Sequence, residues 1–295
     1  MTELKAGLAA SLPPPEWLVP RSGPAAGMRL AFRAYSASGS PRAHVLISHG
    51  FSEHSGWWQH VALALQASGV SAYLFDHYHH GQSDGRVADV PSYDVLAAGL
   101  ALALEEGVLP RAGSGPVVLL GHSNGGLASL HALPRLAGRL RGLVLCSPLM
   151  RMLWVTQWLG VIPAWTMSVF QPGAYWPLPE HPDRLTSVAA LWPQYEQDPL
   201  RFHKITPRFY LAMRAASARA RARTDVDGLP LLLLSAEDEL VVDRPAMLRW
   251  YERLAAADKT HIVHPGCRHE LFNEREWLRV VEEVVSWIAA RCATP

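Results

Sequence analysis

The sequence lacks any strong excess of one charge. Its 295 residues include 27 lysines and arginines against 26 aspartates and glutamates, which gives a formal net charge of +1. A nucleic-acid-binding protein ordinarily carries a clear basic excess, so we expect no nucleic-acid partner. Cysteine is also scarce, and the widely spaced Cys146, Cys267 and Cys292 make neither a disulfide framework nor a zinc site. Free thiols fit a reducing compartment.

The sequence also lacks a persuasive signal peptide and an uninterrupted membrane span. The apolar stretch 7–12 is short and runs directly into prolines 13–15, so we expect a cytoplasmic protein. Residues 153–170 carry no charge over 18 residues, which just reaches the length of a candidate transmembrane helix. Because Gly160 and Pro163 interrupt this run, we predict a lid that can touch a membrane surface transiently, rather than a span.

Short apolar runs alternate with helical patterns along most of the chain. Hydrophobic residues make up 49% of the sequence and charged residues 18%, a mixture that can bury a large core. The runs rich in Val, Leu and Ile are continuous, as in strands covered on both faces, and lie at 43–48, 70–75, 116–120, 143–146, 230–234 and 260–263. This alternation predicts an α/β fold whose mostly parallel central sheet is flanked by helices.

The same alternation divides the chain into a core and an insertion. We expect an irregular N-terminal arm over 1–27, an α/β core over 28–148 and 208–295, and a cap, or lid, over 149–207, where no clear strand appears. The cap holds many prolines and tryptophans, most of which we expect to serve packing. A cap above an active site also roofs an apolar pocket, and Trp154 and Trp158 are our candidates there for substrate contact.

The strongest chemical signal is the G-x-S-x-G pattern at residues 121–125. It follows the predicted strand 116–120 and precedes a predicted helix over 126–136, which is the context of a nucleophile elbow. The elbow projects its serine above the strand ends, where ligands bind in open α/β sheets. Ser123 is therefore the predicted nucleophile of a serine hydrolase, and His122 beside it is a candidate for substrate contact.

A serine hydroxyl needs a base to remove its proton, and on this fold the acid and then the histidine follow the serine in the chain. His269 lies in the loop after the last predicted strand and before the final helix, so we predict it to be the base. Strand 230–234 leads into Glu237, Asp238 and Glu239, and spacing alone leaves open which carboxylate orients the imidazole. Asp243 is a further candidate, but the following Arg-Pro favours a helix N-cap.

An oxyanion hole requires backbone N–H groups aimed at the developing negative charge. One is expected from Asn124, directly after the nucleophile, and the other from Phe51 in the loop after strand 43–48. Gly50 allows a close approach of this backbone to substrate, and the Phe51 ring can line the pocket. The histidines at 77, 79 and 80 come without the carboxylate or cysteine set of a metal site, so we expect a structural loop, no metal and no organic cofactor.

Three motifs together resemble the monoacylglycerol lipase and lysophospholipase branch of the α/β hydrolases, a serine aminopeptidase S33-like (Hydrolase_4) family. Residues 49–56 resemble its HGxxEHSG loop, 76–85 its DHxGHGxSxG stretch, and 121–126 its GHSMGG elbow. The resemblance implies that Asp238 is the catalytic acid and His269 the base. Two departures bear on substrate preference: Asn124 stands where methionine is usual, and His79 where glycine is usual.

These observations predict a serine carboxylic-ester hydrolase that works through an acyl-enzyme on Ser123. The resemblance implies a single-chain lipid ester as substrate, either a monoacylglycerol or a lysophospholipid. A broad-specificity carboxylesterase for short esters is the alternative within the class, and the triad residues do not distinguish an ester from an amide. A non-catalytic ligand-binding protein of the same fold is the alternative from another class. Oligomeric state and acyl-chain length are not predicted.

Overall fold

A central eight-stranded sheet organises the molecule in the computed structural model, which describes residues 12–153, 161–178 and 181–292. The sheet order is β1-β2-β4-β3-β5-β6-β9-β10. Its strands are β1 (Glu16–Leu18), β2 (Leu30–Tyr35), β3 (Ala43–Ser48), β4 (Val70–Phe75), β5 (Val117–His122), β6 (Gly142–Cys146), β9 (Leu231–Ala236) and β10 (Lys259–His264). The pairs from β4 to β10 are parallel, whereas β1 and β2 are antiparallel to their neighbours. The predicted mostly parallel α/β sheet is thereby confirmed.

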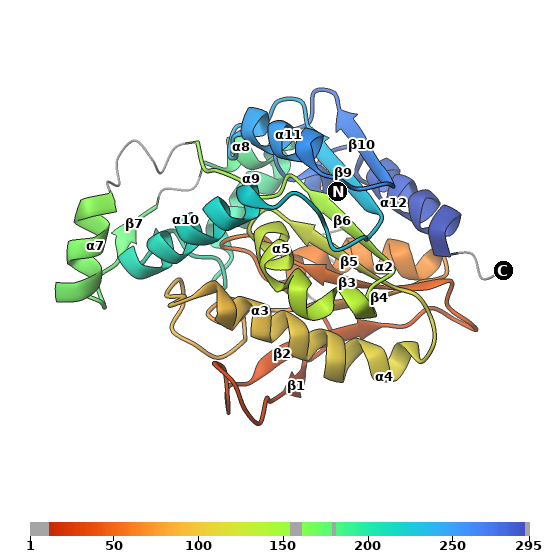
Figure 1. Ribbon diagram of the computed structural model, residues 1–295, viewed down its shortest axis with the longest axis horizontal. Coiled ribbons are helices and arrows are strands. Elements are labelled where there is room, and N and C mark those ends of the chain that lie inside the picture. Colours follow the sequence, from red (N-terminus) through yellow and green to blue (C-terminus); the bar gives the residue numbers. More distant parts are fainter. Residues whose placement is uncertain (1–11, 154–160, 179–180, 293–295) are drawn as a thin grey trace.

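Helices cover both faces of this sheet (Figure 1). The principal ones are α2 (Gln59–Ala67), α3 (Tyr93–Leu102), α5 (Asn124–Leu136), α10 (Pro207–Ala222), α11 (Arg244–Arg253) and α12 (Trp277–Cys292), with the single turn α4 (Leu109–Ala112). Helices α3, α5 and α10 enclose one apolar core, and α2 and α12 enclose a second on the opposite face. Because both faces are covered, β3, β4, β5, β6 and β9 are buried along their whole length.

Two elements at the antiparallel edge depart from the sequence prediction. The arm 1–27 was expected to be irregular, but it contains β1, which pairs with β2 as the edge strand of the sheet. Strand β2 was not predicted because Arg33 interrupts its apolar pattern. In the structure Arg33 is buried and donates hydrogen bonds to the Ser55 hydroxyl at 2.6 Å and to the Pro13 carbonyl at 2.8 Å. A strand whose apolar pattern is interrupted by an arginine can therefore still be buried, provided that the guanidinium is hydrogen-bonded.

The segment predicted as a cap lies between β6 and α10. Its described elements are α7 (Val161–Phe170), β7 (Trp176–Pro177), α8 (Pro182–Leu185), α9 (Trp192–Gln197) and β8 (Lys204–Ile205). The small antiparallel pair of β7 and β8 was missed because each strand has only two residues. Helix α7 lies at one end of the molecule, away from the sheet (Figure 1). The division of the chain at 149 and 207 stays a prediction.

No helix within the described residues has both the length and the apolar character needed to cross a membrane. Part of the uncharged run 153–170 forms the ten-residue helix α7, and residues 154–160 lie outside the described residues.

Candidate active site

The predicted elbow is built at the junction of β5 and α5. Ser123 adopts φ 49° and ψ −117°, a backbone conformation that L side chains rarely adopt. The glycines that flank Ser123 are required because a side chain at either position would clash with its neighbours. A Cβ at Gly121 would lie 2.6 Å from the Ser129 hydroxyl, and one at Gly125 would lie 2.0 Å from the carbonyl oxygen of Ser48. The strand, the sharp turn and the helix thus lift Ser123 into the pocket at the carboxyl ends of the strands.

His269 lies in the loop after β10, as the sequence indicated, and it contacts a different carboxylate from the one predicted. Its Nδ1 lies 2.9 and 3.0 Å from the two carboxylate oxygens of Glu239. Asp238, which the family resemblance implied, is exposed, and its backbone N–H donates to the carbonyl of Cys267. The prediction of Asp238 as the residue that orients His269 is therefore wrong, and Glu239 stands in that place.

The local backbone explains why Glu239 is selected from three adjacent acids. Its Oε1 accepts hydrogen bonds from the N–H groups of Val241 and Val242, at 2.8 and 3.1 Å. Val242 is fully buried, and Val241 lines the pocket. Because this apolar turn folds inward, the carboxylate that precedes it is buried with it, whereas Glu237 and Asp238 stay exposed. Proximity to the apolar residues 240–242 was the signal that sequence reasoning could have used.

The buried contact between Glu239 and His269 sets the electrostatics of both groups. Burial lowers the pKa of His269, but the charge and hydrogen bond of Glu239 outweigh it, so the pKa lies above its ordinary value. Burial likewise raises the pKa of Glu239, and the contact with His269 together with the two backbone N–H groups brings it below its ordinary value. Glu239 therefore stays ionised and favours the charged form of the imidazole.

The loop after β3 supplies the second predicted oxyanion donor. Its shape is fixed by Glu53, whose Oε2 accepts hydrogen bonds from the Gly50 N–H at 2.7 Å and from Trp58 Nε1 at 3.1 Å. Within the described chain, the N–H groups of Phe51 and Asn124 have no hydrogen-bond acceptor. Both amides are therefore available to a ligand, and the oxyanion hole stays a prediction that this geometry permits.

The two departures from the family motifs have local structural consequences. The Asn124 side chain is fully buried, and its Oδ1 accepts a hydrogen bond from the Tyr93 hydroxyl of α3, whereas its Nδ2 has no hydrogen-bond partner among the described residues. His79 adopts φ 67°, the left-handed region that favours glycine. Its Nδ1 lies 3.0 Å from the carbonyl of Arg86, which holds the ring in place. The neighbouring His77 and His80 also make hydrogen bonds within the fold, to Ser48 and to the Tyr78 carbonyl.

A buried polar cluster beside the elbow was not anticipated from the sequence. Glu53, His122 and Glu270 each present one ligand-type atom within 4.8 Å of the others, and all three residues are buried. Burial and the nearby Glu270 raise the pKa of Glu53 to about 8. Burial raises the pKa of Glu270 as well, but Arg201 and His122 bring it below its ordinary value. Glu53 and Glu270 come from two separate loops and His122 from the end of β5, so only the tertiary fold reveals the cluster.

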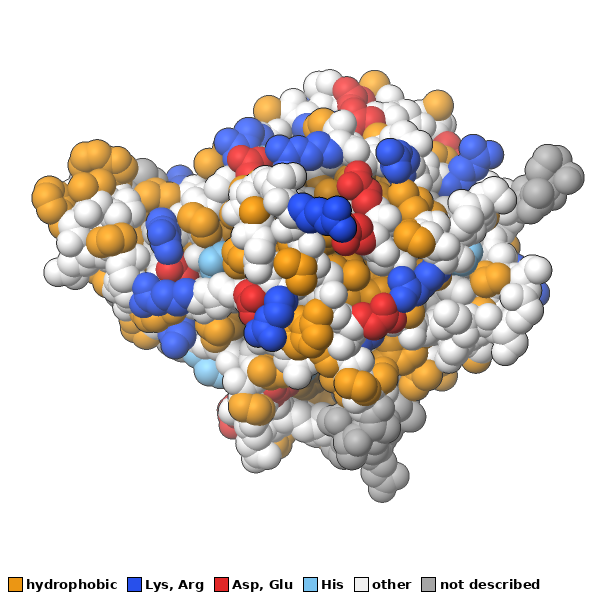
Figure 2. All heavy atoms as spheres, turned by 90° about the horizontal axis from the view of Figure 1, so that it is seen from below, with side chains coloured by type: hydrophobic (Ala, Val, Ile, Leu, Met, Phe, Trp, Pro, Cys, Tyr) orange, Lys and Arg blue, Asp and Glu red, His pale blue; other side chains and the backbone are white. Residues whose placement is uncertain are grey.

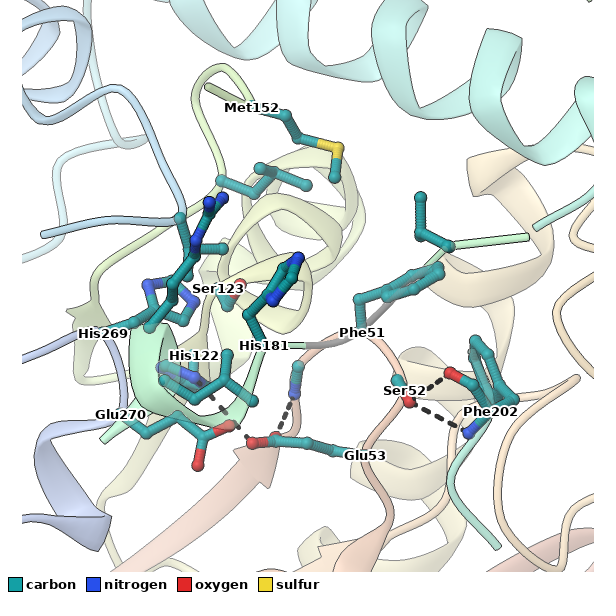
Figure 3. A pocket seen from close by; sticks show the side chains of 16 residues that line it. Phe51, Ser52, Glu53, His122, Ser123, Met152, His181, Phe202, His269 and Glu270 are labelled. Atoms are coloured by element: carbon teal, nitrogen blue, oxygen red, sulfur yellow. Dashed lines mark hydrogen bonds and ion pairs between the residues drawn. The ribbon is translucent and has the colours of Figure 1, made fainter. Parts of the chain in front are cut away.

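One pocket joins these groups (Figure 3). Ser123, His122 and His269 lie on one wall, and Phe51 and Phe202 lie across from them. The lining is apolar over much of its surface, with Phe51, Leu149, Met152, Leu178, Leu185, Phe202 and Val241. Gly50 and His122, two of the predicted substrate contacts, also line it. The other two, Trp154 and Trp158, lie outside the described residues.

The parallel sheet, the strained serine at its elbow and the adjacent imidazole–carboxylate pair define a serine hydrolase of the α/β-hydrolase fold. The model of the family described as "Serine aminopeptidase, S33" (Hydrolase_4) matches residues 39–276, and the chain belongs to this family. It is a serine ester hydrolase.

Relatives agree with this assignment, and a solved structure agrees with the fold. The chain is 26% identical over 272 residues to the monoacylglycerol lipase of Mycolicibacterium smegmatis, covering 90% of this chain and 94% of that one. It is also 26% identical to the human monoglyceride lipase, covering 91% and 89% of the two chains. The fold matches a soluble variant of the Saccharomyces cerevisiae monoglyceride lipase in complex with a substrate analogue, with a TM-score of 0.83, 19% identity and coverage of 96% and 97%.

Proposed function

We propose that this ester hydrolase cleaves single-chain lipid esters, that is, monoacylglycerols or lysophospholipids. The observation that carries the proposal is the pocket, in which Ser123 and His269 meet apolar side chains from both the core and the predicted cap. Leu149, Met152 and Leu178 offer an acyl chain a dry wall beside the reacting atoms. The names of the relatives, which include monoacylglycerol lipases, support the same substrate class.

The proposed reaction is acyl transfer in two steps. Ser123 attacks the ester carbonyl while His269 removes its proton, and the N–H groups of Phe51 and Asn124 stabilise the oxyanion. The protonated His269 then gives its proton to the leaving alcohol, which leaves the acyl group on Ser123. Water attacks the acyl-enzyme with the same assistance and releases the fatty acid. Glu239, in place of Asp238, holds the imidazole and stabilises its charged form throughout.

Helix α7 is a candidate for transient contact with a membrane surface. Trp165, Val169 and Phe170 are exposed by 59, 53 and 79% of their surface. Apolar side chains gather at the end of the molecule where this helix lies (Figure 2). Because exposed aromatic and aliphatic side chains partition into the lipid interface, this helix could bring the pocket close to its substrate.

A substrate series tests the assignment. We would measure hydrolysis of p-nitrophenyl esters with acyl chains from two to sixteen carbons, beside 1-monoacylglycerol and lysophosphatidylcholine, with Ser123→Ala as the control. We expect the wild type to cleave the long-chain esters or at least one of the lipids, and the variant to be inactive. Turnover of short esters alone would contradict the lipid assignment and identify a general carboxylesterase. Absence of all turnover would favour a ligand-binding protein.

A further inference from the structure

The buried cluster of Glu53, His122 and Glu270 has the composition and geometry of a small cation site. We propose that it binds Zn²⁺ and that the bound ion inhibits the enzyme. The ion is not part of the proposed ester hydrolysis, which proceeds without metal. Figure 3 shows the carboxylates of Glu53 and Glu270 turned toward one another below His122.

The hydrogen-bond pattern leaves acceptor atoms facing each other. His122 Nδ1 lies 3.2 Å from the carbonyl oxygen of Cys146. Because a carbonyl only accepts, this nitrogen carries the ring proton, and Nε2 of the neutral ring presents a lone pair. That lone pair lies 3.9 Å from Glu53 Oε1, too far for a direct hydrogen bond. Burial and Glu270 raise the pKa of Glu53 to about 8, so a divalent cation would displace its proton and would then be coordinated by the Nε2 lone pair and by both carboxylates.

Each candidate ligand is also held from behind, as zinc ligands usually are. Glu53 is anchored through Oε2 by the Gly50 N–H and the Trp58 indole, and its Oε1 is directed at His122. The Glu270 carboxylate accepts hydrogen bonds at Oε2 from the Tyr195 hydroxyl and the Asn273 amide. These outer contacts fix the orientation of both carboxylates and leave one oxygen of each for an ion.

A cavity of about 10 Å³ lies against the same residues, with Trp57, Trp58, Phe272 and Asn273 completing its wall. This is about the space that one water molecule or one small ion fills. Glu53, His122 and Glu270 also line the active-site pocket, which gives an ion a route to the cluster and a water molecule to complete its coordination.

The ligand chemistry selects zinc over the hard divalent ions. One imidazole and two carboxylates suit Zn²⁺, whereas Mg²⁺ and Ca²⁺ prefer six or more oxygen ligands. A tetrahedral Zn²⁺ with ligands at about 2.0–2.1 Å places its ligand atoms roughly 3.4 Å apart. At present His122 Nε2 and Glu53 Oε1 lie 3.9 Å apart, and no two of the three ligand atoms are more than 4.8 Å apart, so torsional shifts of the two glutamates would bring the ligands to these distances.

Binding would act on the reaction through His269. The rings of His122 and His269 lie 4.9 Å apart. An ion on His122 places positive charge beside an imidazole that must become positively charged during catalysis, so it raises the barrier. This inhibition rests on the proposed hydrolysis, whereas the binding itself does not.

The test measures Zn²⁺ binding directly, on the full chain without an affinity tag, by titration calorimetry. The variants are Glu270→Gln and Glu53→Gln, and Glu276→Gln is the control because its side chain is exposed on the same loop. We expect one Zn²⁺ per chain. Each of the first two substitutions should weaken binding more than roughly 100-fold, the upper end for loss of an outer-shell partner, and the control should leave it unchanged.

Two further measurements on the folded wild-type protein identify the ligands of the ion and test the inhibition. Co²⁺ bound to the wild type should give visible absorption bands typical of an ion with a low coordination number. The absence of a thiolate charge-transfer band would distinguish this site from one that involves Cys267 or Cys292. Zn²⁺ should also lower ester turnover in the wild type and the control over the concentration range in which it binds. Absence of stoichiometric binding, a thiolate band, or binding unchanged in Glu270→Gln would overturn the proposal. Binding without inhibition would overturn its second half.

Discussion

The carboxylate beside His269 decides how the imidazole is held during the reaction. Because Glu239 accepts from His269 Nδ1 and Asp238 does not contact the ring, Glu239→Gln should lower kcat by about 10⁴, the cost of losing the orienting carboxylate in a serine triad. Asp238→Asn should stay within about threefold of the wild type, because an exposed carboxylate contributes little to a buried proton transfer.

Steady-state hydrolysis of a p-nitrophenyl ester by the two variants checks this prediction. Circular dichroism should show that both remain folded. A large loss in Asp238→Asn with a small loss in Glu239→Gln would restore the family-based assignment and refute ours.

Sequence reasoning located the nucleophile and the histidine better than the acid. Ser123 belongs to a motif with a steric cause, and His269 follows from the order of elements in the chain. The acid sits in a run of three carboxylates, and only the contacts of Glu239 with the inward-facing Val241 and Val242 distinguish it. Glu53, His122 and Glu270 were not grouped, because their proximity depends on how two loops meet the end of β5.

At the scale of elements, the elbow depends on the close packing of the backbone at Gly125 against the backbone at the end of β3, with no side chain between them. A Cβ at Gly125 would lie 2.0 Å from the Ser48 carbonyl and 2.4 Å from that of His49, so neither neighbour can move away cheaply. We expect Gly125→Ala to lower the free energy of unfolding by at least ~3 kcal/mol, at or above the usual range for overpacking. Urea denaturation measures the difference.

Gly138→Ala is the matched control, because nothing lies within 4 Å of a Cβ at that exposed position. It should change the free energy of unfolding by less than about 1 kcal/mol. Equal destabilisation by the two substitutions would show that the close approach at the elbow is not what requires glycine there.

The start of α11 separates a structural acid from the proposed catalytic one. Asp243 accepts a hydrogen bond from the Ala246 N–H at 2.9 Å and pairs with Arg151 at 2.6 Å, in agreement with the N-cap that the sequence indicated. Asp243→Ala should therefore lower the free energy of unfolding by about 1–2 kcal/mol, while kcat stays near that of the wild type. Loss of kcat without loss of thermal stability would return Asp243 to the candidates for the acid.

The parallel core was predictable because each buried strand is a continuous apolar run. Strands β3 and β4 begin and end where the sequence indicated. Strands β1 and β2, the last two strands at the antiparallel side of the sheet, were missed because they carry polar residues that only tertiary contacts satisfy. In the predicted cap, elements as short as β7 and β8 leave no periodic signal.

At the scale of the whole molecule, a partly buried contact between a carboxylate and an imidazole joins the predicted cap to the core. Asp198 lies 2.9 Å from His54 Nε2 and accepts a hydrogen bond from Trp57 Nε1 at 2.7 Å. Burial raises the pKa of Asp198, but the contact with His54 and the other hydrogen bonds lower it to about 2, against an ordinary value of 3.8.

This depressed pKa predicts how stability responds to acid. The contribution of Asp198 is present above its ordinary pKa and is lost as the pH falls from about 4 through about 2, since the unfolded chain takes up the proton first. Asp198→Asn should lower Tm at pH 7 and flatten its decline over that interval. Glu196→Gln, at an exposed position in α9 just before Asp198, should retain the wild-type profile. Parallel profiles for Asp198→Asn and the wild type would contradict this account.

The most direct test of the central claim asks whether Ser123 is an activated nucleophile. A fluorophosphonate probe would be added to the wild type, His269→Ala and Ser123→Ala, and the modified peptide would be identified by mass spectrometry. We predict rapid modification of Ser123 in the wild type, much slower modification in His269→Ala, and none at this peptide in Ser123→Ala. If folded wild-type protein hydrolyses esters while Ser123 stays unmodified, or if the probe reacts at another serine, the proposed mechanism is wrong.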